Sequence, residues 1–165
     1  MKNVMKGYTL IEIMLVSVII VVVLTGVLSL QIWSSGVQAS ARHASRVLAL
    51  MRTEMEEIKE TARMSTPARN FDTIIPTYNN TDVSFAPLNL NGIMHINASQ
   101  ANLAGGGGAE ANLIDIRIVA GWVETNGNII GEGIRGGAGN FQFQDTNGNG
   151  QFDSPYVLIS AVARR

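Results

Sequence analysis

The residues best suited to chemistry lie near the carboxyl end of the chain, in residues 145–153, with the sequence Asp-Thr-Asn-Gly-Asn-Gly-Gln-Phe-Asp. Side chains with oxygen atoms stand at the first, third, fifth and ninth positions, and glycine stands at the sixth. This spacing matches the first three-quarters of an EF-hand-like calcium loop, in which alternating side chains and the seventh carbonyl converge on a hard cation. The pattern predicts a weak calcium site formed by Asp145, Asn147, Asn149, Gln151 and Asp153.

The predicted calcium loop departs from the pattern at its twelfth position, where Tyr156 replaces the glutamate that closes such loops. With only two carboxylates, the expected Kd for calcium is about 10⁻⁴ to 10⁻³ M, as in extracellular modules. The same asparagine, aspartate and glycine residues also favour a metal-free turn between two strands. The sequence leaves both interpretations open.

The sequence gives little support to enzymatic chemistry. Cysteine is absent, which excludes disulfides, cysteine-based metal sites and cysteine nucleophiles. Residues 131–136 match the pattern GxGxxG, but more glycine follows where a dinucleotide-binding loop needs the start of a helix. His43 and His95 have no second histidine or carboxylate at metal-ligand spacing in the sequence. We therefore expect that the protein is not an enzyme.

Glu12 is unusual because it is an acidic residue at the start of a long apolar run. Residues 13–41 carry no charged side chain, and about 20 apolar residues in a helix are enough to cross the ~30 Å hydrocarbon core of a bilayer. An ionised carboxylate within the membrane costs roughly 2 to 4 kcal/mol or more unless it is paired. We therefore expect Glu12 to have a partner of opposite charge.

The residues around Glu12 form a longer motif: a short basic head, then Gly7, Tyr8, Thr-Leu-Ile-Glu and the apolar run. This motif resembles the prepilin signature of type IV pilins and type II secretion pseudopilins. The resemblance implies that a prepilin peptidase removes a leader of residues 1–7 by cutting after Gly7, and methylates the new amino terminus at Tyr8. It also implies that Glu12 pairs with the amino terminus of an adjacent subunit during assembly.

An ordinary secretory signal peptide is an alternative interpretation of the amino end. Such a signal has an apolar region of only about 7 to 15 residues followed by a cleavage site with small residues. Residues 39–41, Ala-Ser-Ala, offer a possible cleavage site, but they follow a much longer apolar run. The prepilin interpretation is therefore the preferred one.

The element that positions these residues is one long helix, expected from about Tyr8 to about Met64. Residues 8–33 form its expected transmembrane part, and residues 34–64 form an amphipathic continuation. In the continuation, apolar residues recur at steps of three and four, which is the spacing of one helix face. These residues are Val47, Met51, Met55, Ile58 and Ala62. We expect this stripe to pack on a sheet, with the charged opposite face in solvent.

The rest of the chain divides into a connector and a sheet. Residues 65–112, rich in proline, asparagine and glycine, are expected to form an irregular variable connector with at most short edge strands. Residues 113–165 are expected to form a small antiparallel sheet that includes the possible calcium loop. Its strands are a period-two strand from Leu113 to Val123, a return strand over 128–135 after an Asn-Gly turn, and a last strand over 156–162.

These elements predict an α+β fold, with a long amino-terminal helix packed on a small antiparallel β-sheet, similar to that of pilins. A weaker resemblance to minor pilins and minor pseudopilins rests on residues 48–58 and on the strand ending in Gly-Trp-Val at residues 121–123. The chain is long enough for one domain plus an anchor.

The charged residues indicate how the chain is oriented in the membrane and whether a nucleic acid partner is expected. The net charge is −1, and removing Lys2 and Lys6 with the leader leaves 10 basic against 13 acidic residues, so we expect no nucleic acid partner. Because these lysines precede the apolar run and Arg42 is the first basic residue after it, the amino end is expected in the cytoplasm and the carboxy-terminal domain outside it.

Taken together, the sequence predicts a structural subunit of a type IV pilus or a type II secretion pseudopilus, as a major, minor or tip component. The resemblance implies a bacterial inner-membrane location before assembly into the filament. It also implies as partners other pilin-like subunits through the helix, the prepilin peptidase, an inner-membrane assembly platform and membrane lipid. The alternative is a membrane-anchored, calcium-stabilised binding module that does not polymerise.

Overall fold

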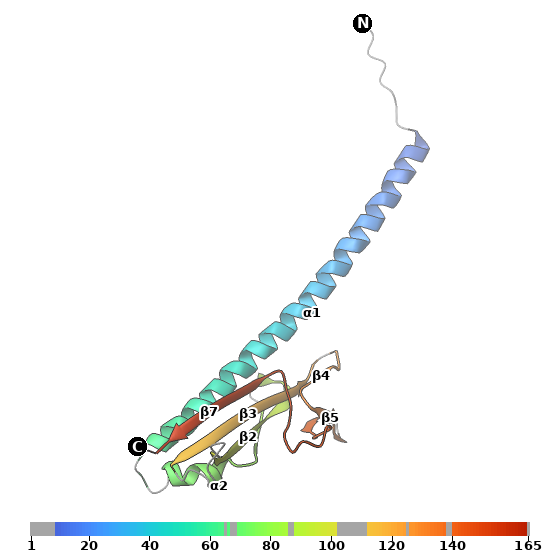
Figure 1. Ribbon diagram of the computed structural model, residues 1–165. Helices are drawn as coiled ribbons and strands as arrows, with labels where there is room; N and C mark the ends of the chain where they lie inside the picture. The colour runs from blue at the N-terminus through green and yellow to red at the C-terminus, as the bar shows by residue number, and fades with distance from the viewer. Residues whose placement is uncertain are drawn as a thin grey trace. The chain divides into compact units, whose positions relative to one another are not determined.

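The computed structural model describes residues 9–64, 66, 69–85, 88–101, 112–124, 126–137 and 140–164. They belong to two compact units, one ending at Arg42 and the other beginning at His43. The elements in chain order (Figure 1) are α1 (Leu10–Arg63), η1 (Phe71–Thr73), α2 (Ile74–Tyr78), β1 (Thr81–Ser84), β2 (Asn91–Gln100), β3 (Leu113–Val123), β4 (Ile129–Ile130), β5 (Gly133–Arg135), β6 (Phe141–Phe143) and β7 (Val157–Ala163).

In the first unit, α1 is an uninterrupted apolar helix whose large side chains are exposed. Its few hydroxyl groups donate hydrogen bonds to carbonyls of the preceding turn: Ser17 to Met14 at 2.7 Å, and Thr25 to Val21 at 2.8 Å. This internal pairing is what a helix in an apolar environment requires, because lipid offers polar groups no partners. The helix also continues through Gly26 without a break.

Among the described residues, one helix is long and apolar enough to cross a membrane, and it is α1. An 18-residue window of this helix has a mean hydropathy of 3.0, and none of that window is buried. The predicted long apolar helix is therefore present, and by length and composition it is suited to a bilayer.

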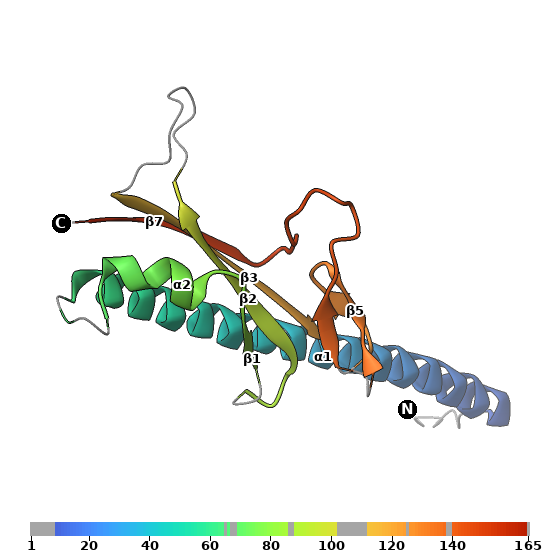
Figure 2. The ribbon, with the colours of Figure 1, turned by 90° about the horizontal axis from the view of Figure 1, so that it is seen from below.

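The second unit contains the hydrophobic core, in which the last part of α1 packs on one face of the sheet (Figure 2). From the helix, Val47, Met51, Met55 and Ile58 are buried, as the predicted stripe requires, and Thr61 is buried beside them. From β3, alternate residues face the helix, because successive side chains of a strand point to opposite faces. These residues are Ile114, Ile116, Ile118, Ala120 and Trp122. The predicted α+β fold, a long helix against an antiparallel sheet, is confirmed.

The main sheet is antiparallel and has β3 at its centre. β1 pairs with β2, β2 pairs with β3 along ten residues, and both β4 and β7 pair with the opposite side of β3. The predicted strands Leu113–Val123 and 156–162 therefore correspond to β3 and, within one residue, to β7. β5 and β6 form a separate two-stranded sheet.

The prediction of an irregular connector over residues 65–112 is wrong in its middle. Residues 91–100 form β2, a fully paired strand next to β3, and Met94, Ile96 and Ala98 are buried in the core. The apolar stretches over residues 83–85 and 92–96 were expected at most as short edge strands, whereas β2 is ten residues long and pairs with both β1 and β3. Residues 65, 67–68, 86–87 and 102–111 of the connector lie outside the described residues.

The predicted return strand over 128–135 is also only partly correct. Only Ile129 and Ile130 pair with β3, and the chain then turns at Gly131, whose φ is +92°, before β5 pairs with β6. A residue with a Cβ rarely adopts this φ, so glycine permits the turn. The glycine-rich stretch that resembles a dinucleotide-binding motif is thus a turn followed by a short strand.

Candidate functional site

The first candidate site is at the start of α1. The backbone N–H of Thr9 donates a hydrogen bond to Oε2 of Glu12 at 3.1 Å, and the hydroxyl of Thr9 lies 3.3 Å from the same oxygen. The Thr9 carbonyl in turn accepts from the N–H groups of Glu12 and Ile13. This is the glutamate half of a capping box, for which Thr-x-x-Glu is the sequence signal. The sequence prediction of an intermolecular partner for Glu12 overlooked this local one.

Gly7 and Tyr8, the residues predicted for cleavage and methylation, lie outside the described residues. Thr9, the first described residue, directly follows them. The carboxylate of Glu12 is bonded to Thr9, the residue that follows the predicted methylation position in the sequence. The positive end of the helix dipole also favours a carboxylate in this first turn.

The second candidate site is the loop predicted to bind calcium, which is folded around the side chains of Asp145 and the two asparagines. Asp145 accepts hydrogen bonds from the backbone N–H groups of Gly148 and Gly150, both at 2.7 Å. Asn147 and Asn149 each accept one from the backbone two residues further on, at 2.9 and 2.7 Å. Gly148 and Gly150 have φ values of +71° and +77°, which explains why glycine occupies both positions.

Glu132, which the sequence analysis did not identify, is the residue that holds this loop from outside. Its Oε1 accepts from the backbone N–H of Thr146 at 2.6 Å, the hydroxyl of Thr146 at 2.5 Å and the backbone N–H of Asn147 at 3.1 Å. Its Oε2 accepts from the backbone N–H of Asp153 at 2.9 Å. The hydrogen bond from the hydroxyl of Thr146, and next in effect the one from the N–H of Asp153, lower the pKa of Glu132 to about 2.

Arg117, on β3, binds the opposite end of the loop. Its guanidinium donates to the side-chain oxygen of Gln151, to the backbone carbonyl of Phe152 at 3.1 Å and to Oδ1 of Asp153 at 3.4 Å. The other oxygen of Asp153 accepts from the side-chain amide of Asn147 at 2.9 Å. Both oxygens of this predicted calcium ligand therefore already have donors, and one donor is a cation.

Hydrogen bonds within the chain use part of the acceptor capacity of the predicted calcium ligands. Calcium takes six to eight oxygen ligands, and the side-chain oxygens at four of the five predicted positions accept hydrogen bonds from the chain's own N–H groups (Asp145, Asn147, Asn149 and Asp153). The fifth, Gln151, binds Arg117. Among the described residues, no group of three or more histidine, cysteine or acidic side chains could hold a metal. Calcium binding stays a prediction.

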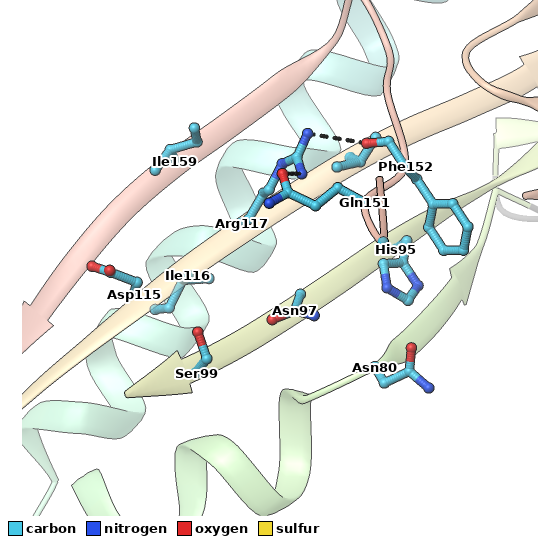
Figure 3. A pocket seen from close by; sticks show the side chains of 12 residues that line it. Asn80, His95, Asn97, Ser99, Asp115, Ile116, Arg117, Gln151, Phe152 and Ile159 are labelled. Carbon is cyan, nitrogen blue, oxygen red and sulfur yellow. Dashed lines mark hydrogen bonds between the residues drawn. The ribbon is translucent and has the colours of Figure 1, made fainter. Parts of the chain in front are cut away.

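The loop also forms one wall of a polar groove on the sheet face opposite α1. The groove has a volume of about 540 Å³. Figure 3 shows Asn97 and Ser99 on β2 beside Asp115 and Arg117 on β3, with Gln151 and Phe152 above them. The groove contains both hydrogen-bond donors and acceptors.

His95 lies at one end of this groove and is held by structural contacts. Its Nδ1 is 2.7 Å from Oδ1 of Asp82 across the β1–β2 pair. Its ring packs edge-on against Phe152 at 4.8 Å and Phe143 at 6.0 Å between ring centroids. These contacts join His95 to β1, β6 and the loop. His43, the other histidine, lies in α1 and lines a separate cavity.

Comparison with known protein families identifies a motif at the amino end of the chain. The family described as "Prokaryotic N-terminal methylation motif" matches residues 2–28. No curated protein and no solved structure matches the chain. The matched range contains the expected cleavage site, Glu12 and the first half of the apolar run, so the chain carries a prepilin-type methylation motif at its amino end.

Proposed function

We propose that this chain is a pilin-like structural subunit that assembles into a type IV pilus or a type II secretion pseudopilus. The observation that carries the proposal is the combination of the methylation motif with a single long helix, apolar and exposed in its first unit and packed on an antiparallel sheet in its second. An exposed apolar helix must be covered by lipid or by other helices. Lipid covers it before assembly, and helices of neighbouring subunits cover it in the filament.

In this proposal, a prepilin peptidase cuts after Gly7 and methylates Tyr8, and the subunit is then anchored in the inner membrane with its second unit outside the cytoplasm. The carboxylate of Glu12 pairs with the methylated amino terminus of a neighbouring subunit. Its bond to the N–H of Thr9 keeps it at the amino end of the helix, where that pair forms. Shielding from both water and lipid in the helix bundle strengthens the attraction.

The finer assignment is a minor or tip component, based on the weaker resemblance of residues 48–58 and 121–123 to minor subunits. Such a subunit offers a distinctive outer surface, and here the polar groove and the loop beside it face away from α1. The assembly platform of the inner membrane is the expected partner during incorporation.

Cysteine crosslinking in membranes tests the proposal, and the absence of native cysteine makes the result unambiguous. Val16→Cys and Leu24→Cys, in the exposed apolar part of α1, each labelled with a thiol-attached photocrosslinker, should give crosslinks to other pilin-like chains. Ile159→Cys, exposed at 74% on the groove face of the sheet, is the matched control and should give far fewer. If the helix variants remain monomeric in cells that produce the filament, the chain is instead an anchored module that does not polymerise.

A further inference from the structure

We propose that the loop of residues 144–153, here called the strap, is folded by Glu132 and Arg117 and forms without a metal ion. The two residues come from different parts of the chain, and each one binds several groups of the strap. The strap is thereby fixed over the sheet as a preformed wall of the polar groove. This inference concerns the second unit alone and does not depend on assembly into a filament.

On one side of the strap, the carboxylate of Glu132 accepts four hydrogen bonds. The donors are the backbone N–H groups of Thr146, Asn147 and Asp153 and the hydroxyl of Thr146, at distances from 2.5 to 3.1 Å. Because Thr146 and Asp153 lie near the two ends of the strap, a single carboxylate ties the ends together. Hydrogen bonds to an ionised group are stronger than those between neutral groups.

The backbone of Glu132 adds two further connections. Its N–H donates to the carbonyl of Asp153 at 2.6 Å, and its carbonyl accepts from the N–H of Gln144 at 3.3 Å. Glu132 is therefore attached to the strap through its side chain and its main chain. The turn at Gly131, with φ at +92°, brings Glu132 to this position after the short β4 strand.

On the other side of the strap, the positively charged guanidinium of Arg117 binds the strap. The guanidinium contacts three consecutive residues: the side chain of Gln151, the carbonyl of Phe152 and the carboxylate of Asp153. A fork of several donors suits this task, and lysine could not reproduce it. Since this cation already lies beside Asp153, a calcium ion bound there would meet like-charge repulsion.

An aromatic contact fixes the strap against the sheet. The ring of Phe152 stacks on Phe143 of β6 with centroids 4.9 Å apart, and it packs edge-on against His95 of β2. The strap is thus joined to β2, β3 and β6 at once. Gly150, Gln151 and Phe152 line the groove as a consequence, so Glu132 and Arg117 act as positioning residues for this surface.

Amide hydrogen exchange of the full chain in detergent micelles tests the proposal, with the metal chelator EGTA or millimolar calcium present. In the wild type, the amides of Thr146, Asn147 and Asp153 should be protected equally in both solutions. Glu132→Gln should increase their exchange rates by at least about tenfold, because the neutral amide accepts these bonds more weakly. Glu60→Gln, a change of the same kind at an exposed residue of α1, should leave them unchanged.

A second variant, Thr146→Val, keeps the shape of the side chain and removes one donor to Glu132. It should increase the exchange rates of the same three amides less than Glu132→Gln does, while the amides of β2 remain protected. The proposal is overturned if wild-type protection appears only with calcium, since the ion would then fold the strap. It is also overturned if Thr146→Val leaves the strap amides unchanged, even where Glu132→Gln prevents folding.

Discussion

Oε2 of Glu12 lies 3.1 Å from the backbone nitrogen of Thr9, so the acidic residue at the start of the apolar helix is bonded to the first turn of its own helix. A carboxylate at this place has two functions that do not exclude each other. It caps the helix, and in the proposed filament its negative charge pairs with the amino terminus of a neighbouring subunit. The capping function requires only a hydrogen-bond acceptor, whereas pairing between subunits requires a charge.

The variant Glu12→Gln separates these functions because glutamine keeps an acceptor oxygen and loses the charge. We expect normal membrane insertion and at least about tenfold less incorporation into filaments, since breaking a buried charge pair costs about 3–5 kcal/mol. Quantitative blotting of sheared filaments against membranes measures the ratio. Thr9→Val, which removes the hydroxyl near Glu12 and leaves the charge, is the control and should assemble almost normally. Equal incorporation of Glu12→Gln and wild type would rule out the pairing role.

Processing gives a second prediction. Mass spectrometry of the chain from cells that contain a prepilin peptidase should find an amino terminus at Tyr8 that carries one added methyl group. Gly7→Val should block the cut, because a side chain at this position would obstruct the close approach of the peptidase to the backbone. The unprocessed chain should then keep Lys2 and Lys6 and accumulate in the membrane. A cut elsewhere, for example after residue 41, would support the ordinary signal peptide instead.

The elements that could be predicted from the sequence are those with a periodic apolar pattern. The stripe Val47, Met51, Met55 and Ile58 and the alternation in β3 are local signals, and both are buried as expected. β2 has the same kind of alternation, with His95 and Asn97 on the face opposite Met94, Ile96 and Ala98, but the alternation alone does not give its partner. Its place beside β3 depends on pairing with a strand more than ten residues away, which no local pattern specifies.

The loop site shows a similar limit. The spacing of Asp145, Asn147 and Asn149 correctly indicated an asparagine-rich turned loop, and that pattern comes from residues close together in the chain. Glu132 and Arg117 are separated from the loop by other elements, and neither stands at a spacing that links it to the loop. Their contacts arise only when β3, the β4–β5 turn and the loop come together, so sequence spacing could not identify them.

Close packing at Gly92 leads to a third prediction, on stability. A Cβ at this position would collide with the Cβ of Trp122 and lie 2.5 Å from the carbonyl oxygen of Gly121. The new Cβ would also lie 2.8 Å from Cα of Trp122, and this atom and the Gly121 oxygen belong to the backbone of the central strand, so they cannot move aside cheaply. Gly92→Ala should lower the free energy of unfolding by about 1–3 kcal/mol. Denaturant unfolding followed by tryptophan fluorescence measures this, with Gly137→Ala as the control because a Cβ there meets nothing within 4 Å. Equal stability of both variants would contradict the packing.

The last prediction concerns acid stability and Glu132. The hydroxyl of Thr146 and the backbone N–H of Asp153 lower the pKa of Glu132 from 4.5 to about 2 in the folded chain. A carboxyl with a lowered pKa stabilises the fold fully above its unfolded value, and the effect is lost as the pH falls toward the folded value. The difference in stability between wild type and Glu132→Gln should therefore be constant above about pH 5 and shrink between about pH 4.5 and 2.

Thermal unfolding of both proteins across this range, followed by circular dichroism, gives the difference at each pH. Taking the difference removes the contribution of the other carboxylates, which titrate in both proteins. Glu60→Gln, compared with wild type in the same way, is the control, because Glu60 is exposed and its partner Arg63 is 3.9 Å away. If the stability difference between wild type and Glu132→Gln stayed unchanged down to pH 2, the charge of Glu132 would not be what holds the strap.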